Sequence, residues 1–148
     1  MTKPVCAVVG IGPSNGAAFA RRFAAEGYAV ALLSRKTSYS SELATELGDA
    51  KAYACDVTDA AAVERAFASV REELGEVEVL IYNAGSGVWG NIEELSPEAF
   101  EQSWRVNALG AFLVSKQVVP AMKAKGAGTI VFVGATASLR GKPFTTAF

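Results

Sequence analysis

A glycine-rich loop links the first apolar run of the chain to an alanine-rich stretch. It reads Gly10-Ile11-Gly12-Pro13-Ser14-Asn15-Gly16. A glycine at its start permits a tight turn, and a glycine at its end lets the backbone and a following helix approach a ligand closely. Because the N-terminus of a helix attracts anions, this setting is typical of a pyrophosphate site. The last glycine comes one residue later than in the common dinucleotide pattern, so an ordinary strand-to-helix turn is the alternative.

The second apolar run ends in the polar residues Ser34-Arg35-Lys36. In a dinucleotide site this position faces the adenosine ribose, where an acidic side chain favours NAD and an arginine accommodates the 2′-phosphate of NADP. Ser34 is small and neutral and Arg35 follows it, so together with the glycine loop they favour NADP over NAD. Taken alone, Arg35 is equally well explained as a solvated charge after a strand.

Histidine is absent from the sequence, and this excludes several kinds of active site. It removes Ser-His-Asp and Cys-His nucleophiles, histidine-ligated zinc and a histidine general base. Cys6 and Cys55 form no CxxC motif and lie in strand-like apolar runs, where a cysteine usually packs as a small core residue. We therefore expect no metal site, a reducing environment and a cytoplasmic location.

The elements that must position these residues alternate between strand-like and helix-like patterns. Continuous apolar runs indicate strands buried on both faces, and apolar residues at helical spacing indicate amphipathic helices. Ser40, Asp59 and Ser96 are the predicted N-caps of three helices. This alternation predicts a parallel sheet with helices on both faces. The expected strands are 5–9, 29–33, 51–55, 77–82 and 129–133, and the expected helices are 16–26, 40–47, 60–74 and 97–125, the last with a bend.

Length and composition predict one globular domain, residues 1–148. Of the 148 residues, 51% are hydrophobic and 20% are charged, which allows a substantial core. Lys and Arg number 14 against 15 Asp and Glu, so we expect neither nucleic acid nor a membrane surface as a partner. No apolar stretch reaches the length of about 18 residues that a transmembrane helix needs.

Three further motifs make the pattern specific. Asp56-Val57 follows the third expected strand, Asn83-Ala84-Gly85 follows the fourth, and Asn107 lies inside the long helix. Together with the glycine loop they resemble the short-chain dehydrogenase/reductase family, in order and spacing, over the whole chain. The resemblance implies a Rossmann-type α/β fold, a three-layer sandwich with strand order 3-2-1-4-5. It also implies one NADP-binding domain that is truncated at its C-terminus relative to the full family fold.

The resemblance assigns the glycine and polar positions to cofactor binding. The first and last loop glycines match those of the family, Ser14 stands at the middle glycine, and Gly12 is an additional one. Asp56 matches the acid that contacts adenine, and the Asn-Ala-Gly segment steadies the sheet beside the cofactor. The implied set is Gly10, Gly12, Ser14, Asn15, Gly16, Ser34, Arg35, Asp56, Val57, Asn83, Ala84 and Gly85.

The catalytic positions depart from the family pattern. In the family a tyrosine is the acid/base of hydride transfer, a lysine one helical turn later lowers its pKa, and a serine positions the carbonyl. Asn107 matches the tetrad asparagine, which holds a water in a proton relay. Ala135 stands at the serine position and Phe148 at the tyrosine position, and the lysine falls beyond the chain. Ser138 and Thr136 are nearby hydroxyls, of which Ser138 is a weak candidate to replace the serine.

These observations lead to one favoured function and two alternatives. The favoured one is an NADP-dependent oxidoreductase of a small carbonyl or alcohol, with this chain as its cofactor-binding half, inactive alone. The alternative is a non-catalytic NADP-binding protein in which Ala135 and Phe148 record lost chemistry. A methyltransferase expects an acid where Ser34 stands, which disfavours it. The expected partners are a nicotinamide dinucleotide, a small-molecule substrate and a second copy of the chain, bound through the apolar helix segment between Asn107 and Met122.

Overall fold

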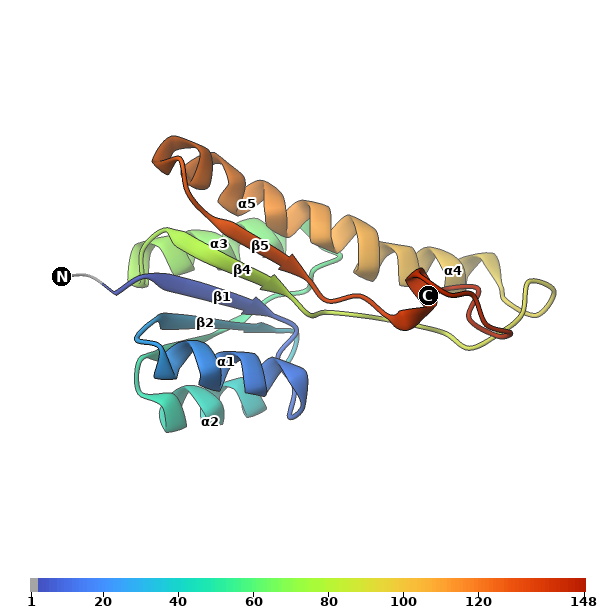
Figure 1. The fold of residues 1–148 in the computed structure, drawn as a ribbon, viewed down its shortest axis with the longest axis horizontal. Helices are drawn as coiled ribbons and strands as arrows, with labels where there is room; N and C mark the ends of the chain where they lie inside the picture. The colour runs from blue at the N-terminus through green and yellow to red at the C-terminus, as the bar shows by residue number, and fades with distance from the viewer. Residues whose placement is uncertain (1–2) are drawn as a thin grey trace.

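Five parallel strands form the central sheet of the computed structural model, which describes residues 3–148 (Figure 1). They are β1 (Val5–Val9), β2 (Ala29–Ser34), β3 (Ala50–Ala54), β4 (Val77–Tyr82) and β5 (Thr129–Phe132). Their order across the sheet is β3-β2-β1-β4-β5, which confirms the predicted order. Val5 at the start of β1 pairs with Ala29 of β2 on one side and with Val77 of β4 on the other. The strand order therefore reverses between β1 and β4, where open α/β sheets bind their ligands.

Helices cover both faces of the sheet and complete the three layers. Figure 1 shows α1 and α2 on one face and α3 and α5 on the other. The helices are α1 (Asn15–Ala25), α2 (Ser38–Leu47), α3 (Ala60–Glu73), α4 (Pro97–Trp104) and α5 (Gly110–Lys125), with a π-helical turn η1 (Arg105–Leu109) between the last two and a 3₁₀ turn η2 (Thr136–Ser138) after β5. No helix end differs from the expected bounds by more than two residues, which is the usual uncertainty of helix ends.

The hydrophobic core lies in two layers, one on each face of the sheet. Successive residues of a strand point to opposite faces, so Val5, Ala7 and Val9 pack under α3 and α5, while Cys6 and Val8 pack under α1 and α2. Both cysteines are free and buried, and burial raises the pKa of Cys55 to about 11. Their thiols are thus protonated core groups, as the apolar runs predicted.

Two of the three predicted helix caps are confirmed and one is wrong. Asp59 accepts hydrogen bonds from the amides of Ala61 and Ala62, and Ser96 accepts one from the amide of Ala99. Ser40, by contrast, lies inside α2, which begins at Ser38. Its buried hydroxyl donates to the carbonyl of Thr37, so the side chain closes the first turn from within.

The bend expected in the long helix is the π turn η1. Here the amide of Gly110 donates to the carbonyl of Arg105, five residues back. The helix then continues to Lys125 and ends at Gly126, whose φ of 69° is a left-handed cap. The turn lies where the helix passes the carboxyl end of β4, next to the candidate site.

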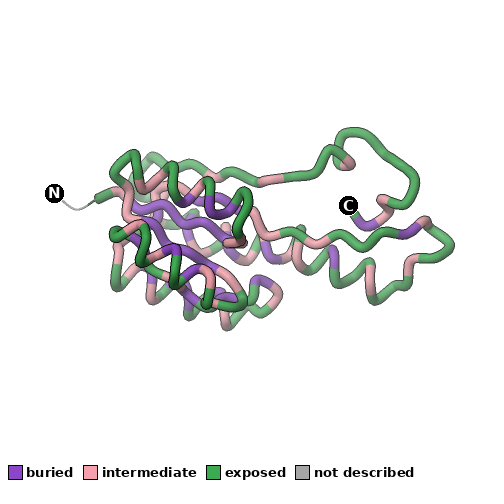
Figure 2. The backbone as a smooth tube through the Cα atoms, turned by 90° about the horizontal axis from the view of Figure 1, so that it is seen from below, coloured by how far each residue is buried: buried purple, intermediate pink, exposed green. Residues whose placement is uncertain are grey.

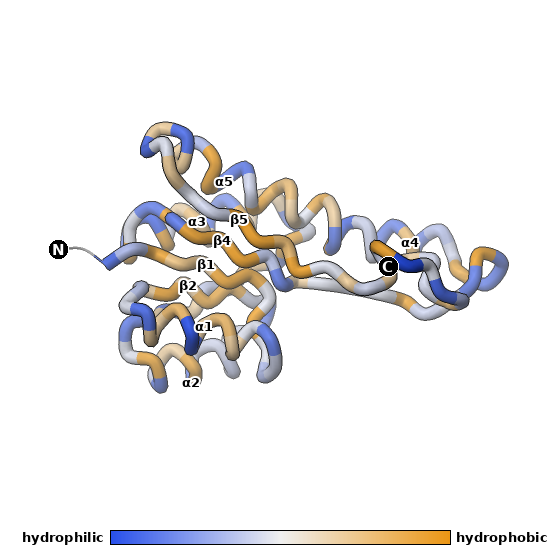
Figure 3. The backbone as a smooth tube through the Cα atoms, viewed as in Figure 1, coloured by the Kyte–Doolittle hydropathy of each residue, from blue (hydrophilic) through white to orange (hydrophobic). Residues whose placement is uncertain are grey.

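The segments that follow β4 and β5 project beyond the sheet together with α4 (Figures 1 and 2). They are joined by a hydrogen bond from the amide of Gly90 to the carbonyl of Phe144, 3.0 Å long. β5 is one of the two edge strands of the sheet and is largely hydrophobic (Figure 3), and its residue Phe132 is 58% exposed. Within residues 3–148, no helix has the length and apolarity to cross a membrane.

Candidate functional site

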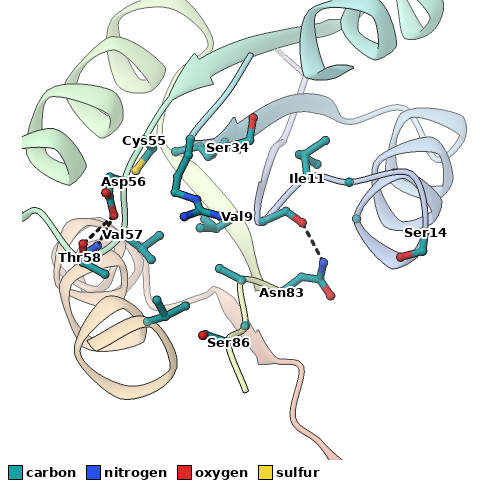
Figure 4. A pocket seen from close by; sticks show the side chains of 18 of the residues that line it. Val9, Ile11, Ser14, Ser34, Cys55, Asp56, Val57, Thr58, Asn83 and Ser86 are labelled. Carbon is teal, nitrogen blue, oxygen red and sulfur yellow. Dashed lines mark hydrogen bonds between the residues drawn. The ribbon is translucent and has the colours of Figure 1, made fainter. Parts of the chain in front are cut away.

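A cavity of about 470 Å³ opens at the carboxyl ends of β1, β2 and β4 (Figure 4). It lies at the reversal of strand order, where the fold predicts a ligand. All but one of the expected cofactor residues line it, and the exception is Asn15, which begins α1. The lining residues include these from the predicted set: Gly10, Gly12, Ser14, Gly16, Ser34, Arg35, Asp56, Val57, Asn83, Ala84 and Gly85.

The glycine loop is packed tightly against the segment after β4. Gly10 has a φ of 94°, and a Cβ there would lie 2.6 Å from the Cα of Ala84. A Cβ at Gly16 would lie 2.6 Å from the carbonyl oxygen of Gly10. Both positions therefore need glycine, the first for its backbone conformation and both for the close approach.

Asn83 holds the loop in this position. Its Nδ2 donates to the carbonyl of Gly10 over 2.8 Å (Figure 4). Its backbone amide donates to the carbonyl of Val9, also over 2.8 Å. The side chain thus links the end of β4 to the turn that follows β1. The floor of the cavity is therefore formed by two strand ends that are joined by hydrogen bonds.

The middle of the loop explains its unusual glycine spacing. Ser14 has a φ of −99°, so a glycine is not required at that position. Its hydroxyl makes no capping bond to α1 and lines the cavity. A Cβ at Gly12 would meet no atom within 4 Å, so this extra glycine is not demanded by packing.

Opposite charges lie on the side of the cavity away from α1. Arg35 follows β2, and Asp56 follows β3. Hydrogen bonds from the amide and the hydroxyl of Thr58 hold the pKa of Asp56 below its usual range, and the charge of Arg35 acts in the same direction. Asp56 is therefore an ionised acceptor at neutral pH.

Ser34 is the small neutral residue at the end of β2. Its hydroxyl donates to the carbonyl of Lys36 over 2.9 Å and lies 3.0 Å from the hydroxyl of Ser40. The cavity is also lined by residues that sequence reasoning did not single out for the site, namely Val9, Ile11, Leu33, Cys55, Thr58, Ser86, Gln102 and Val106. Only Thr58 carried a usable signal, as the hydroxyl two residues after the expected adenine acid.

A second cavity of about 560 Å³ adjoins the first and brings the expected catalytic positions together. Asn107, Ala135, Ser138 and Phe148 all line it. Both ends of the Asn107 amide bind Ser86: Nδ2 donates to the Ser86 carbonyl over 2.6 Å, and Oδ1 accepts from the Ser86 amide over 2.9 Å.

The hydroxyl and aromatic groups of the second cavity are also engaged. The Ser138 hydroxyl donates to the carbonyl of Ala135 over 2.7 Å. The Phe148 ring lies against Gly87 and is tilted against Trp89, with ring centroids 5.0 Å apart. Among the described residues that line this cavity, Tyr82 is the single titratable side chain. Burial raises the pKa of Tyr82 above its ordinary value.

Residues 4–148 match the family described as short chain dehydrogenase. The chain belongs to this family. Across 119 residues it is 36% identical to the 3-oxoacyl-[acyl-carrier-protein] reductase MabA of Mycobacterium tuberculosis. The aligned residues make up 80% of this chain and 45% of that relative. The chain thus spans about half the length of a curated short-chain dehydrogenase that it matches.

Solved short-chain dehydrogenases share the fold closely. An alcohol dehydrogenase from the archaeon Thermococcus sibiricus, complexed with 5-hydroxy-NADP, superposes with a TM-score of 0.92 at 32% identity. The superposition covers 97% of this chain and 63% of the alcohol dehydrogenase chain. An NAD⁺-bound xylitol dehydrogenase gives 0.91 at 33% identity, covering 99% of this chain and 58% of its own. The matches therefore extend from the glycine loop to the second cavity.

Proposed function

We propose that this chain binds NADP and belongs to an oxidoreductase that acts on a small carbonyl or alcohol. The observation that carries the proposal is the first cavity, where a glycine cradle, a helix N-terminus, an arginine and an ionised aspartate converge. The cradle suits a pyrophosphate and Asp56 suits the adenine amino group as an acceptor. When bound, the nicotinamide would supply the hydride to a carbonyl or accept it from an alcohol.

The proposed course of the dinucleotide runs from the first cavity to the second. Ala84, Gly85 and Ser86 line both cavities, so the two sites form one continuous surface. Adenosine would lie near Asp56 and Arg35, the pyrophosphate over the glycine loop, and the nicotinamide beside Ser86. Asn107 would then fix the backbone that the nicotinamide contacts.

Cofactor preference depends on Arg35 in this proposal, because NADP carries a 2′-phosphate and NAD does not. Arg35→Ala should weaken NADPH binding by about 10- to 100-fold, the range expected for a charge-assisted hydrogen bond. Binding of NADH should change by less than about threefold, since it lacks the phosphate. A fluorescence titration of both cofactors against both proteins measures the difference.

Arg22→Ala is the matched control for Arg35→Ala. Arg22 lies on α1, its side chain is 75% exposed, and it pairs with Glu26. The substitution therefore removes a guanidinium that lies away from the cavity. This variant should bind NADPH as the parent protein does. Equal losses for NADPH and NADH in Arg35→Ala would contradict the assignment of Arg35 to the phosphate, and no binding of either by the parent protein would contradict the cofactor site.

A second candidate function is NADP binding without turnover, and the second cavity favours it. Ala135 and Phe148 offer no proton donor where the family has a serine and a tyrosine. Tyr82 does not replace them, since its hydroxyl donates to the carbonyl of Val106 and burial disfavours its ionisation. The Ser138 hydroxyl already donates to a backbone carbonyl.

Turnover tests whether the protein carries out carbonyl chemistry despite Ala135 and Phe148. With NADPH and a panel of small ketones and aldehydes, the protein should oxidise NADPH no faster than the cofactor decays alone. The double variant Ala135→Ser, Phe148→Tyr restores the two missing hydroxyls, and any rate it gains identifies lost chemistry. Rapid carbonyl reduction by the unaltered protein would contradict the interpretation of Phe148 and support the oxidoreductase.

We also propose that a second copy of the chain packs on α5. Phe112 is 61% exposed on this helix and Val119 is 36% exposed, in the segment for which the sequence predicted an interface. Burial of such side chains between two copies is favourable by about 25 cal/mol per Å² of apolar surface.

A further inference from the structure

Tyr82 occupies an unusual position between the sheet and the π turn. It is the last residue of β4, is 3% exposed, and immediately precedes Asn83. Its ring packs in the core and is tilted against Phe132, with centroids 6.5 Å apart. The hydroxyl crosses to the neighbouring helix and donates to the carbonyl of Val106.

The Val106 carbonyl is free to accept this hydrogen bond because of the π turn. In a regular α-helix it would accept from the amide of Gly110, four residues on. That amide instead donates to the carbonyl of Arg105. The Tyr82 hydroxyl thus takes the place of the backbone donor that the π turn has removed, and this hydroxyl, on a residue that is 3% exposed, would be costly to leave without a partner.

Gly110 makes room for this contact. A Cβ at Gly110 would collide with the Tyr82 hydroxyl and lie 2.9 Å from Cβ of Val57. At this residue the helix therefore contacts the end of β4 and the segment that follows β3. Asn107 lies one residue after Val106, so the same contact sets the direction of its side chain toward Ser86.

We infer that Tyr82 is a positioning residue, whose hydroxyl fixes the π turn and thereby holds Asn107 on the backbone of Ser86. The consequence for activity rests on the proposed function, in which Ser86 lies beside the nicotinamide. The structural part stands on the hydrogen bonds alone. Without the hydroxyl, the turn is free to relax to a regular helix, which would rotate Asn107 away from Ser86.

The test is the hydrogen-exchange rate of the Ser86 amide, which Asn107 protects, measured by NMR. Tyr82→Phe keeps the ring and removes the hydroxyl, and it should speed Ser86 exchange at least about tenfold. Asn107→Ala removes the acceptor itself and sets the fully released rate. Unchanged Ser86 exchange in Tyr82→Phe would overturn the inference.

Tyr53→Phe is the matched control. Tyr53 is 7% exposed in β3, and its hydroxyl donates to Glu73, away from the π turn. This variant should leave Ser86 exchange within about twofold of the parent protein, whatever its effect on overall stability. An equal acceleration in both variants would mean a general loosening of the fold and would overturn the inference.

A measurement on the parent protein keeps the inference testable if Tyr82→Phe does not fold. The Tyr82 hydroxyl proton should exchange slowly enough to be observed, with a nuclear Overhauser contact to the Gly110 α-protons. A hydroxyl that exchanges rapidly with water would overturn the inference. An NADPH titration of the parent protein separates failure of the positioning role from failure of the proposed function. If Ser86 exchange is faster in Tyr82→Phe but the parent protein does not bind NADPH, the proposed function is contradicted and the positioning role stands.

Discussion

Gly10→Ala should lower the free energy of unfolding by about 2–6 kcal/mol, a large part of the stability of a domain of this size. Alanine at a φ of 94° is strained by about 1–3 kcal/mol, and the contact with Ala84 adds about 1–3 kcal/mol of overpacking. The free energy of unfolding of a natural domain is about 5–15 kcal/mol in total. The backbone of Ala84 cannot yield easily, because the adjacent Asn83 is bonded to Val9 and Gly10. Urea unfolding followed by circular dichroism measures the loss.

Gly12→Ala is the control, because it makes the same glycine-to-alanine substitution two residues further along the loop. Its Cβ would meet no atom within 4 Å, and its φ lies outside the left-handed region. The free energy of unfolding should change by less than about 0.5 kcal/mol. If Gly12→Ala destabilised the protein as much as Gly10→Ala, the loop would not have the described conformation.

Phe67→Ala should cost about 3–5 kcal/mol, the range for removing a fully buried aromatic ring. Phe67 lies on α3, is 0% exposed, and belongs to the core cluster between the sheet and helices α3 and α5. The loss combines the transfer of the ring to water with the cavity that remains. Thermal and urea unfolding should both show it, with the midpoint lowered and the urea dependence little changed.

Phe112→Ala removes the same ring from the surface. Phe112 is 61% exposed on α5, so the truncation should change the free energy of unfolding by less than about 1 kcal/mol when the protein is monomeric. A comparable loss in both variants would indicate that α5 is covered in solution. Measuring the two variants over a range of protein concentrations distinguishes that case, since only an oligomer depends on concentration.

The sheet and most of the first cavity could be predicted from the sequence because their signals are local. The apolar runs, the glycine loop and the cap at Asp59 each depend on residues close together in the chain. Parallel strands bring their carboxyl ends to one edge, so Arg35, Asp56 and Asn83 had to converge. The family resemblance then supplied the strand order, and the structure confirms it.

The geometry of the π turn could not be predicted, because it depends on contacts between distant segments. The sequence indicated a bend in the long helix, but the Tyr82 hydroxyl bonds to a carbonyl 24 positions away. The partner of Asn107 is likewise the backbone of Ser86, 21 positions away, with no side-chain signal. The N-cap predicted at Ser40 was wrong for the converse reason, because a local preference was overridden. Serine favours N-caps, but here its hydroxyl makes a buried hydrogen bond inside the first turn of the helix.

The central place of β1 in the sheet bears on how the chain folds. Val5 pairs with Ala29 and with Val77, and the second partner lies about three times as far along the chain. Closing the longer loop costs only about 1 kcal/mol more in chain entropy. This cost comes before the contacts between β1 and β4 can form and offset it. The unit from β1 to β3 can therefore form first from nearer contacts, and docking of β4 on β1 becomes the slow step. That docking also brings Asn83 to the loop at Gly10, so the edge of the sheet that carries the candidate site is not complete until β4 has docked.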